Sequence, residues 1–258
     1  MSNKLAPIVA LASLAALAAC GGEAPPPPTP AAGAKKTAPA PAGYQVADAG
    51  GGGGISGTVR VTGSVPAPEV IEVNKDNAVC GNEKKLHDIQ VGDGGVLAGA
   101  VVWIDDIKKG KAWSDGKAGS VDQKGCDYSP QIQVLSKGAS LDVINSDNIL
   151  HNIHAYAGDE TLFNIAQPMQ GMKTSKTLEK SGPIHLKCDV HSWMSAYVFV
   201  AANPYFAVTG ADGSFSLADV PPGAYSVKVW HGKFGEKSGS ATVEAGGTAT
   251  LDLELQAS

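Results

Sequence analysis

Alternation of apolar and polar residues is the main pattern of the chain after residue 54. In ISGTVRVTG (55–63), Ile55, Val59 and Val61 stand among small and polar residues. Such period-two alternation, rich in Val, Ile, Tyr and Trp, predicts half-buried β-strands. Strands are predicted at residues 55–63, 99–105, 130–135, 140–146, 196–201, 225–230 and 250–256. The only helix that the pattern allows in this part of the chain is a short turn near residues 78–85.

Turn signals separate the predicted strands. Glycine and proline clusters such as Asp212-Gly213 and Pro221-Pro222-Gly223 stand between the apolar runs. Strands at short, regular spacing with turns of this kind are typical of β-sandwiches and barrels. The predicted fold class is therefore all-β, and residues 55–258 are enough for one large β domain or two small ones.

The N-terminus has the pattern of an export signal. Lys4 precedes an apolar run at residues 5–19, which is shorter than the ~20 residues that span a membrane. This pattern predicts a signal peptide at 1–19. The run ends in LAAC, which resembles a bacterial lipobox, and the resemblance implies that Cys20 carries lipid. A plain signal peptide followed by a chance cysteine is the alternative. Gly21, after the cysteine, resembles the outer-membrane default of lipoprotein sorting, so we expect a cell-envelope lipoprotein facing the periplasm or the cell surface.

A linker and the overall charge limit the partners. Residues 20–54 consist mainly of Pro, Gly and Ala, which cannot bury a core and predict a lipid-anchored, semi-extended tether. The formal net charge is −5, and without Lys4 it becomes −6. Basic clusters are absent from the sequence, which argues against nucleic acid as a partner. The expected contact with the membrane is through the lipid alone.

The four cysteines have different expected roles. An exported protein meets an oxidising environment, where thiols tend to pair. If Cys20 carries lipid, then Cys80, Cys126 and Cys188 remain, which is an odd number. Of these, Cys188 has a histidine and a methionine close by, so we favour a Cys80–Cys126 disulfide and a metal-binding thiolate at Cys188. The other pairings would leave a lone thiol open to oxidation, and the sequence leaves the connectivity open.

The C-terminal part resembles a known β-sandwich. The segment VTGADGSFSLADVPPGAYSVKVWHG (208–232) is similar to the carboxypeptidase regulatory-like family, which is transthyretin-like in fold. SGTVRV (56–61) and AGAVVWI (98–104) resemble the first strands of the same family, but about 100 residues separate them from the third element, where the family has a few. The resemblance implies a sandwich split into residues 55–111 and 203–258, with residues 112–202 inserted.

The insert resembles a second family. It holds NSDNILHN (145–152) and KCDVHSWM (187–194), which are similar to the ligand segments of cupredoxins, the blue-copper proteins. The short Cys-x-x-His-x-x-Met spacing is most like that of amicyanin. The resemblance implies a Greek-key β-sandwich with one type 1 copper site, and Asn152 would hydrogen-bond the ligand loops. The implied copper ligands are His151, Cys188, His191 and Met194. It also implies that His191 reaches the surface and serves as the electron port.

The residue chemistry suits the same metal. A thiolate and two imidazoles serve both oxidation states of copper, and a weak axial thioether tunes the potential. Zinc is the alternative metal, since Cys and His also bind Zn²⁺. His154 and His185 are each an odd number of residues from a predicted ligand, so in extended chain they would face away from the site. The other side chains give weaker alternatives: His87, expected to be solvated, His231, packed or exposed, and the pair Met169 and Met172, which could take Cu(I).

A closed site with four protein ligands favours electron transfer over catalysis. Multicopper oxidases need His-x-His pairs, and the sequence contains none. We therefore expect a lipid-anchored type 1 copper protein that is not an enzyme and that exchanges single electrons with a c-type cytochrome or a periplasmic dehydrogenase. A cell-surface binding or adhesion module and a copper storage or delivery protein are the alternatives.

Overall fold

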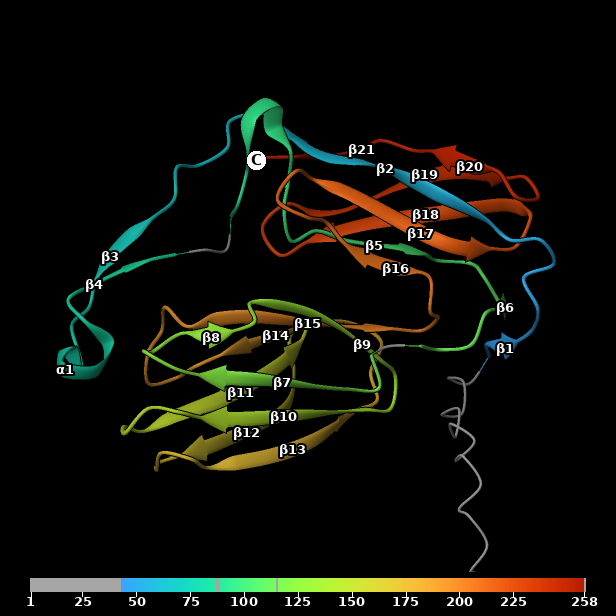
Figure 1. Ribbon diagram of the computed structural model, residues 1–258. Coiled ribbons are helices and arrows are strands. Elements are labelled where there is room, and N and C mark those ends of the chain that lie inside the picture. The colour runs from blue at the N-terminus through green and yellow to red at the C-terminus, as the bar shows by residue number, and fades with distance from the viewer. Residues whose placement is uncertain (1–42, 87–88, 115, 258) are drawn as a thin grey trace, which may run out of the picture. The chain divides into compact units, whose positions relative to one another are not determined.

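Short β-strands make up nearly all regular structure in the computed structural model, which describes residues 43–86, 89–114 and 116–257 (Figure 1). They are arranged in several sheets, and the all-β prediction is confirmed. The predicted signal peptide, Cys20, most of the linker and His87 lie outside the described residues. Among the described residues, no helix has the length and apolar character needed to cross a membrane.

One pair of sheets draws its strands from both ends of the chain, and we call it the terminal sandwich. Its core contains Ile55, Val59 and Leu97 from early segments and Phe215 and Val227 from late ones. The alternation predicted for 55–63 is visible in strand β2 as inward Ile55, Val59 and Val61. The first sheet consists of β16 (Phe206–Val208), β5 (Val101–Ile104), β18 (Gly223–His231) and β19 (Gly235–Val243). The second consists of β17 (Ser214–Val220), β2 (Gly53–Thr62), β20 (Thr248–Thr250) and β21 (Leu253–Gln256).

The predicted strand 250–256 is divided in the structure. β20 and β21 both run parallel to β2, and Leu251 lies between them. At this point Gly57 of β2 comes so close that a Cβ on it would lie 1.8 Å from the Leu251 carbonyl oxygen. A glycine is required where two backbones approach in this way.

The second pair of sheets comes from the middle of the chain, and we call it the inserted sandwich. Its core includes Leu141, Ile153, Leu186 and Val198, and Cys188 and Met194 belong to the same apolar cluster. The first sheet consists of β13 (Lys173–Leu178), β10 (Ala139–Asn145), β7 (Ala118–Gln123) and β8 (Tyr128–Ser129). The second consists of β12 (Glu160–Gln167), β11 (His151–Ala157), β14 (Gly182–Lys187), β15 (Ser195–Ala201) and β9 (Ile132–Ser136).

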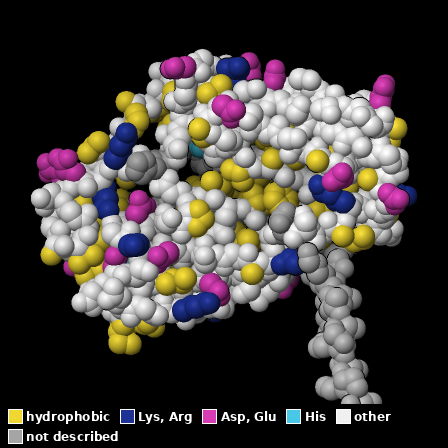
Figure 2. Space-filling model, in the orientation of Figure 1, with side chains coloured by type: hydrophobic (Ala, Val, Ile, Leu, Met, Phe, Trp, Pro, Cys, Tyr) yellow, Lys and Arg dark blue, Asp and Glu magenta, His cyan; other side chains and the backbone are white. Residues whose placement is uncertain are grey.

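Aromatic side chains join strands of the two sandwiches. Trp103 of β5 packs on Phe199 of β15 with ring centroids 4.6 Å apart, and Tyr197 of β15 meets Trp230 of β18 at 5.0 Å. Val101, Trp113, Phe199 and Ala201 form a separate buried cluster here. Apolar side chains also gather near the middle of the face shown in Figure 2. The two sandwiches use separate sheets, so a shared core and not a shared sheet connects them.

Residues 70–85 depart from the predicted organisation, and we call them the arm. The arm contains β3 (Val70–Glu72), the one-turn helix α1 (Asn77–Cys80) and β4 (Glu83–Lys85), and β3 pairs with β4. Although 55–111 was expected to form half of the terminal sandwich, Val73 and Cys80 of the arm are buried in the core of the inserted sandwich. The arm therefore lies against a different core from the one its place in the sequence suggested.

The predicted linker also ends earlier than expected. Tyr44 is buried in the core of the terminal sandwich, and its hydroxyl donates to the Lys111 carbonyl oxygen at 2.9 Å. β1 (Gln45–Val46) pairs with β6 (Lys109–Gly110), and β2 begins at Gly53. Residues 44–54 are thus part of the folded body, because Tyr44 supplies apolar area that a tether would leave in water. The 3₁₀ turn η1 (Asp93–Gly95) completes the regular elements.

Candidate metal centre

Two strands of one sheet bring the predicted ligands together. His151 is the first residue of β11, and the inward positions of that strand are His151, Ile153 and Ala155. β14 turns Ile184 and Leu186 inward, and Cys188, two residues further, continues the same side. Because β11 and β14 are antiparallel neighbours, the start of one strand lies beside the end of the other. Strand alternation therefore directs both side chains into the core.

A tight turn after β14 supplies the third predicted ligand. The His191 backbone N–H donates to the Cys188 Sγ at 3.4 Å, and the Met194 N–H donates to the His191 carbonyl at 3.0 Å. The turn ends at Met194, directly before β15. A sulfur that accepts a backbone N–H is better able to carry negative charge, which a metal-bound thiolate requires.

Three donor atoms converge in the interior. The Nδ1 atoms of His151 and His191 are 3.0 Å apart, and the Cys188 Sγ is 3.9 Å from the His191 Nδ1. All three donor atoms lie within 4.8 Å of one another, and both histidines are fully buried. Two nitrogens and one sulfur at these separations can share one ion, since metal–nitrogen bonds of about 2.0–2.1 Å and metal–sulfur bonds of about 2.3 Å reach that far. Met194 is also fully buried, in the same apolar core cluster as Cys188.

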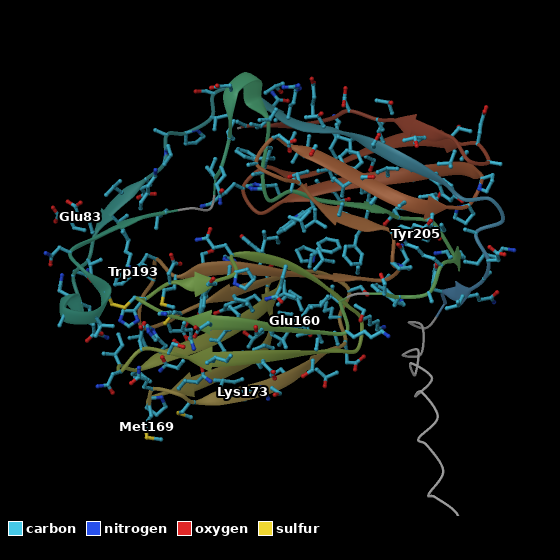
Figure 3. All side chains as sticks on the ribbon, in the orientation of Figure 1. Glu83, Glu160, Met169, Lys173, Trp193 and Tyr205 are labelled. Carbon is cyan, nitrogen blue, oxygen red and sulfur yellow. A yellow bond between two sulfur atoms is a disulfide. The ribbon has the colours of Figure 1, made fainter. Side chains whose placement is uncertain are left out.

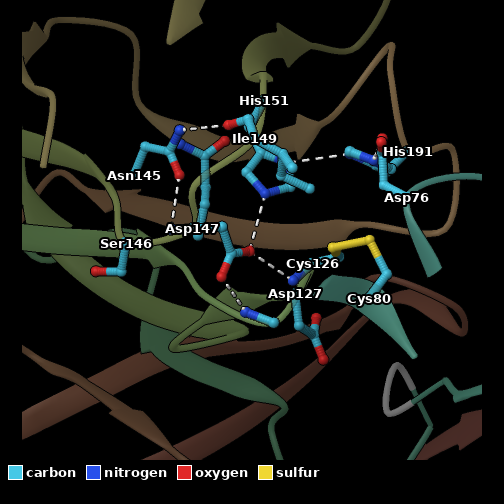
Figure 4. Close-up of polar contacts among 12 residues, drawn as sticks. Asp76, Cys80, Cys126, Asp127, Asn145, Ser146, Asp147, Ile149, His151 and His191 are labelled. Carbon is cyan, nitrogen blue, oxygen red and sulfur yellow. Dashed lines mark hydrogen bonds and ion pairs between the residues drawn. A yellow bond between two sulfur atoms is a disulfide. The ribbon is translucent and has the colours of Figure 1, made fainter. Parts of the chain in front are cut away.

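The outer nitrogens of both rings meet carboxylates. His151 Nε2 lies 2.9 Å from Asp147 Oδ2, and His191 Nε2 lies 2.9 Å from Asp76 Oδ2 (Figure 4). A carboxylate only accepts, so each Nε2 carries the hydrogen and each Nδ1 has a free lone pair. Two lone pairs that face one another at 3.0 Å repel unless a cation lies between them. The geometry therefore suits a metal ion, or failing that a proton, at the point of convergence.

Burial keeps the inner histidine in the form that binds metal. Desolvation lowers the pKa of His151, with the neighbouring His191 adding to the effect, and the Asp147 carboxylate opposes it only in part. A lowered pKa means that the imidazole is neutral at neutral pH, and neutral imidazole is the metal-binding form.

Asp147 is held by a backbone cradle. Its Oδ1 accepts from the Gly125 N–H at 2.7 Å, and its Oδ2 accepts from the Cys126 N–H at 2.8 Å as well as from His151. Burial alone would raise the pKa of the Asp147 carboxyl, but these hydrogen bonds outweigh it and hold the pKa below its ordinary value. Asn145 fixes the loop by accepting from the Asp147 N–H at 3.0 Å. The carboxylate is thus charged and fixed before any metal binds.

Asn152 connects the two ligand segments. Its Oδ1 accepts from the Asp189 N–H at 2.7 Å and lies 3.4 Å from the Cys188 Sγ. Its Nδ2 donates to Asp189 Oδ2 at 2.9 Å, and the Tyr128 hydroxyl donates to its carbonyl at 2.9 Å. This arrangement has the role that the sequence resemblance implied for Asn152, since it ties the start of β11 to the loop after β14.

The expected electron port is not at the surface. The resemblance implied an exposed His191, but its side chain is fully buried under Asp76 of the arm. That expectation is wrong for this chain, because the arm occupies the space in which solvent would reach the ring. Trp193, whose ring centroid is 5.2 Å from that of His191, is the partly exposed aromatic residue of the same loop (Figure 3).

The disulfide lies next to the candidate metal centre. Cys80 of the arm is bonded to Cys126, as the sequence favoured, and Cys188 is the free, buried cysteine among the described residues. The sulfur atoms of Cys80 and Cys126 lie within 4.8 Å of a ring nitrogen of His191. Cys126 thus links the arm to the loop whose N–H groups hold Asp147.

The other described histidines lie outside the group of three donor atoms. His154 faces outward and bonds Asp189 at 3.1 Å, as the parity argument predicted. His231 is buried and stacks on Phe234 with ring centroids 5.0 Å apart. Met169 is 63 % exposed, in the segment between β12 and β13 (Figure 3).

His185 should make the free energy of unfolding depend on pH. It stacks on Tyr197 and bonds Ser195 Oγ at 2.9 Å, and burial, with Lys187 and Lys233 nearby, lowers its pKa to about 4. An unfolded histidine binds its proton near pH 6.5. Between pH 6.5 and 4 the unfolded chain therefore binds more protons, so the free energy of unfolding falls as the pH decreases, by a total on the order of 1–3 kcal/mol after allowance for solvent screening.

Urea unfolding of wild type and His185→Phe at pH 7 and 4.5 measures this effect. Phenylalanine keeps a ring against Tyr197 and cannot titrate, so the variant should lose less stability between the two pH values. An equal loss in both proteins would show that His185 is not the responsible group.

Two residues of the centre were not predicted from the sequence. Asp147 stands four residues before His151 in NSDNILHN, where a polar turn before a strand is a weak local signal. Asp76 has no local signal, because it reaches His191 across 115 positions of sequence. Only the folded path of the arm brings it to the site.

Comparison with known proteins gives partial matches. The model of the carboxypeptidase regulatory-like domain matches residues 195–256, which is less than half of the chain. A search of curated proteins finds no match.

Solved structures of several copper proteins are similar to about a third of the chain. A purple cupredoxin from Nitrosopumilus maritimus is 21% identical, covers 32% of this chain and 99% of its own length, and has a TM-score of 0.30. Amicyanin from Paracoccus versutus is 17% identical, covers 34% and 84%, and has a TM-score of 0.30. A copper-containing nitrite reductase from Thermus scotoductus is 19% identical, covers 35% and 24%, and has a TM-score of 0.29.

Proposed function

We propose that this chain is a type 1 copper protein that carries single electrons and is not an enzyme. The observation that carries the proposal is the convergence of two imidazole Nδ1 atoms and one cysteine sulfur within 4.8 Å in a buried site. Met194, buried in the same apolar core cluster as Cys188, would be the weak axial ligand. Copper, when bound, supplies a one-electron couple that this donor set serves in both oxidation states.

Residues outside the donor set hold the predicted ligands in position. Asp147 and Asp76 hold the outer nitrogens of the two rings, and Asn152 ties the two ligand segments. Ligands held in this way cannot rearrange freely to suit one oxidation state, which favours electron exchange. A buried site without an open face also favours electron transfer over substrate chemistry.

Zinc remains the alternative metal, because the same donors bind Zn²⁺. A structural zinc site more often has a second cysteine than a methionine, and the other two described cysteines are joined in the disulfide. The donor set therefore favours copper.

The setting is also part of the proposal. An exported, lipid-anchored protein with Cys20 as its anchor would exchange electrons with a c-type cytochrome or a periplasmic dehydrogenase in the bacterial envelope. Because His191 is covered, we place the contact with such a partner at Trp193.

Voltammetry of the copper-loaded full chain tests electron transfer against storage. We expect a reversible one-electron couple, and Met194→Gln should lower its potential, because an amide oxygen is harder than a thioether and favours Cu(II). Met169→Gln, a matched change at an exposed methionine, should leave the potential unchanged. Release of copper on reduction would favour storage or delivery and would count against an electron carrier.

A further inference from the structure

The outer histidine of the centre is covered by a segment from another part of the fold. Asp76 belongs to the arm, which leaves the terminal sandwich and packs Val73 and Cys80 into the core of the inserted sandwich. The carboxylate of Asp76 reaches Nε2 of His191 at 2.9 Å (Figure 4). Removal of Asp76 would take this hydrogen-bond partner away from the ring.

The local structure of the arm is arranged around this contact. Asp76 is the N-cap of α1, where an aspartate usually accepts from a helix N–H through its side chain. Here the backbone of Asp76 is left-handed, with φ of 55°, and the side chain makes no capping hydrogen bond. The backbone carbonyl of Asp76 accepts from Val79 and Cys80 instead. In this conformation the Asp76 side chain does not cap the helix, and its carboxylate contacts His191 instead.

Two separate contacts hold the arm in place, and a third ties the ligand loop to the same point. The Cys80–Cys126 disulfide joins α1 covalently to the loop beside the metal centre. The Lys84 ammonium donates to the Gly125 carbonyl, one residue before that cysteine. Trp193 Nε1 donates to the Cys126 carbonyl at 3.0 Å, so the ligand loop is tied to the same point. The arm, the ligand loop and the Asp147 cradle therefore meet at residues 125–126.

We propose that the arm is a built-in cap over the metal centre, in which Asp76 positions His191 and the Cys80–Cys126 disulfide keeps the cap closed. Asp76 is a positioning residue, because it acts through His191. It fixes the tautomer that leaves Nδ1 free and makes the imidazole a stronger donor, as a carboxylate does for a metal-bound histidine. This effect on the metal rests on the proposed copper function, whereas the covering of His191 does not.

Acylation of histidines in the metal-free full chain tests the cap without any metal. Diethyl pyrocarbonate modifies accessible neutral imidazoles, and peptide mass spectrometry reports the rate at each histidine. In wild type, we expect His191 to be as protected as His151 and far slower than the partly exposed His154. In Asp76→Ala and in Cys80→Ser/Cys126→Ser, His191 should react roughly tenfold faster or more, the order expected when a hydrogen bond to a charged group no longer opposes local opening.

Controls separate opening of the cap from loss of fold. His151 should stay protected in both variants, because Asp147 and not the arm holds it. Glu72→Gln, a change at an exposed carboxylate of the same arm, should leave the His191 rate unchanged. If Cys80→Ser/Cys126→Ser also exposes His151, its fold is disturbed. The rate of His191 acylation in Asp76→Ala then tests the cap by itself. The proposal is overturned if wild-type His191 reacts as fast as His154, or if Asp76→Ala leaves its rate unchanged.

The copper-loaded protein gives a second readout. Asp76→Asn should raise the reduction potential, because a weaker imidazole donor stabilises Cu(II) less. If the reduction potential of Asp76→Asn equals that of wild type, Asp76 does not position His191. The arm would then only cover the histidine. If acylation behaves as expected but Cu(II) gives no intense absorption, the cap stands and the proposed copper function fails.

Discussion

Asp147→Ala should lower the free energy of unfolding by about 3 kcal/mol or more, because it leaves three buried or partly buried donors without an acceptor and each such group costs about 1–3 kcal/mol. The change leaves two backbone N–H groups, those of Gly125 and Cys126, without their acceptor. It also leaves Nε2 of the fully buried His151 without a partner. Water cannot easily replace a side chain that is 7 % exposed, so these losses are not compensated.

The same variant should bind copper about 10–100-fold more weakly, because the residue that orients His151 is gone. Urea unfolding measures the first effect, and competition with a copper chelator measures the second. Asp142→Ala is the matched control: its carboxylate pairs with Lys173 at 2.7 Å on the surface of β10, and an exposed pair of this kind contributes little to stability. Equal losses in the two variants would show that the Asp147 cradle has no special role.

Cys188→Ser should have the largest effect on metal binding. Copper(I) prefers soft sulfur, and serine offers a hard oxygen of similar size. Loss of this ligand should weaken Cu(I) binding by more than about 100-fold, since even an outer partner of a ligand is worth about 10–100-fold. The side chain is 3 % exposed and close in shape to serine, so the fold should survive the change.

Competition with a Cu(I) chelator measures this affinity for wild type and variant. Ser192→Ala, at an exposed position of the same loop, is the control and should keep wild-type affinity. If Cys188→Ser bound Cu(I) as tightly as wild type, the metal would have to lie elsewhere, for example at the methionines outside the loop.

Strand alternation explains why much of this centre could be predicted. Ile184, Leu186 and Cys188 share one side of an extended chain, as do His151 and Ile153, and both sets face the core. The period-two pattern therefore predicts the inward direction of two of the candidate ligands, His151 and Cys188. The same parity argument correctly predicted that His154 faces away from the site, where it pairs with Asp189.

The rest depends on contacts between distant segments. The arm was expected to follow the terminal sandwich, but its apolar Val73 and its disulfide at Cys80 attach it to the inserted sandwich. Nothing in the local sequence of the arm specifies which core those residues enter. The burial of His191 was missed for the same reason, because it depends on Asp76, which is remote in sequence.

The visible absorption spectrum of the full chain with Cu(II), under oxidising conditions, tests the central claim most directly. A copper ion bound by the Cys188 thiolate and the two imidazoles should give an intense thiolate-to-copper band, and this band should be absent in Cys188→Ser. A wild-type protein that shows no intense band, or a band that persists in Cys188→Ser, would contradict the assignment of a type 1 copper site to His151, Cys188, His191 and Met194.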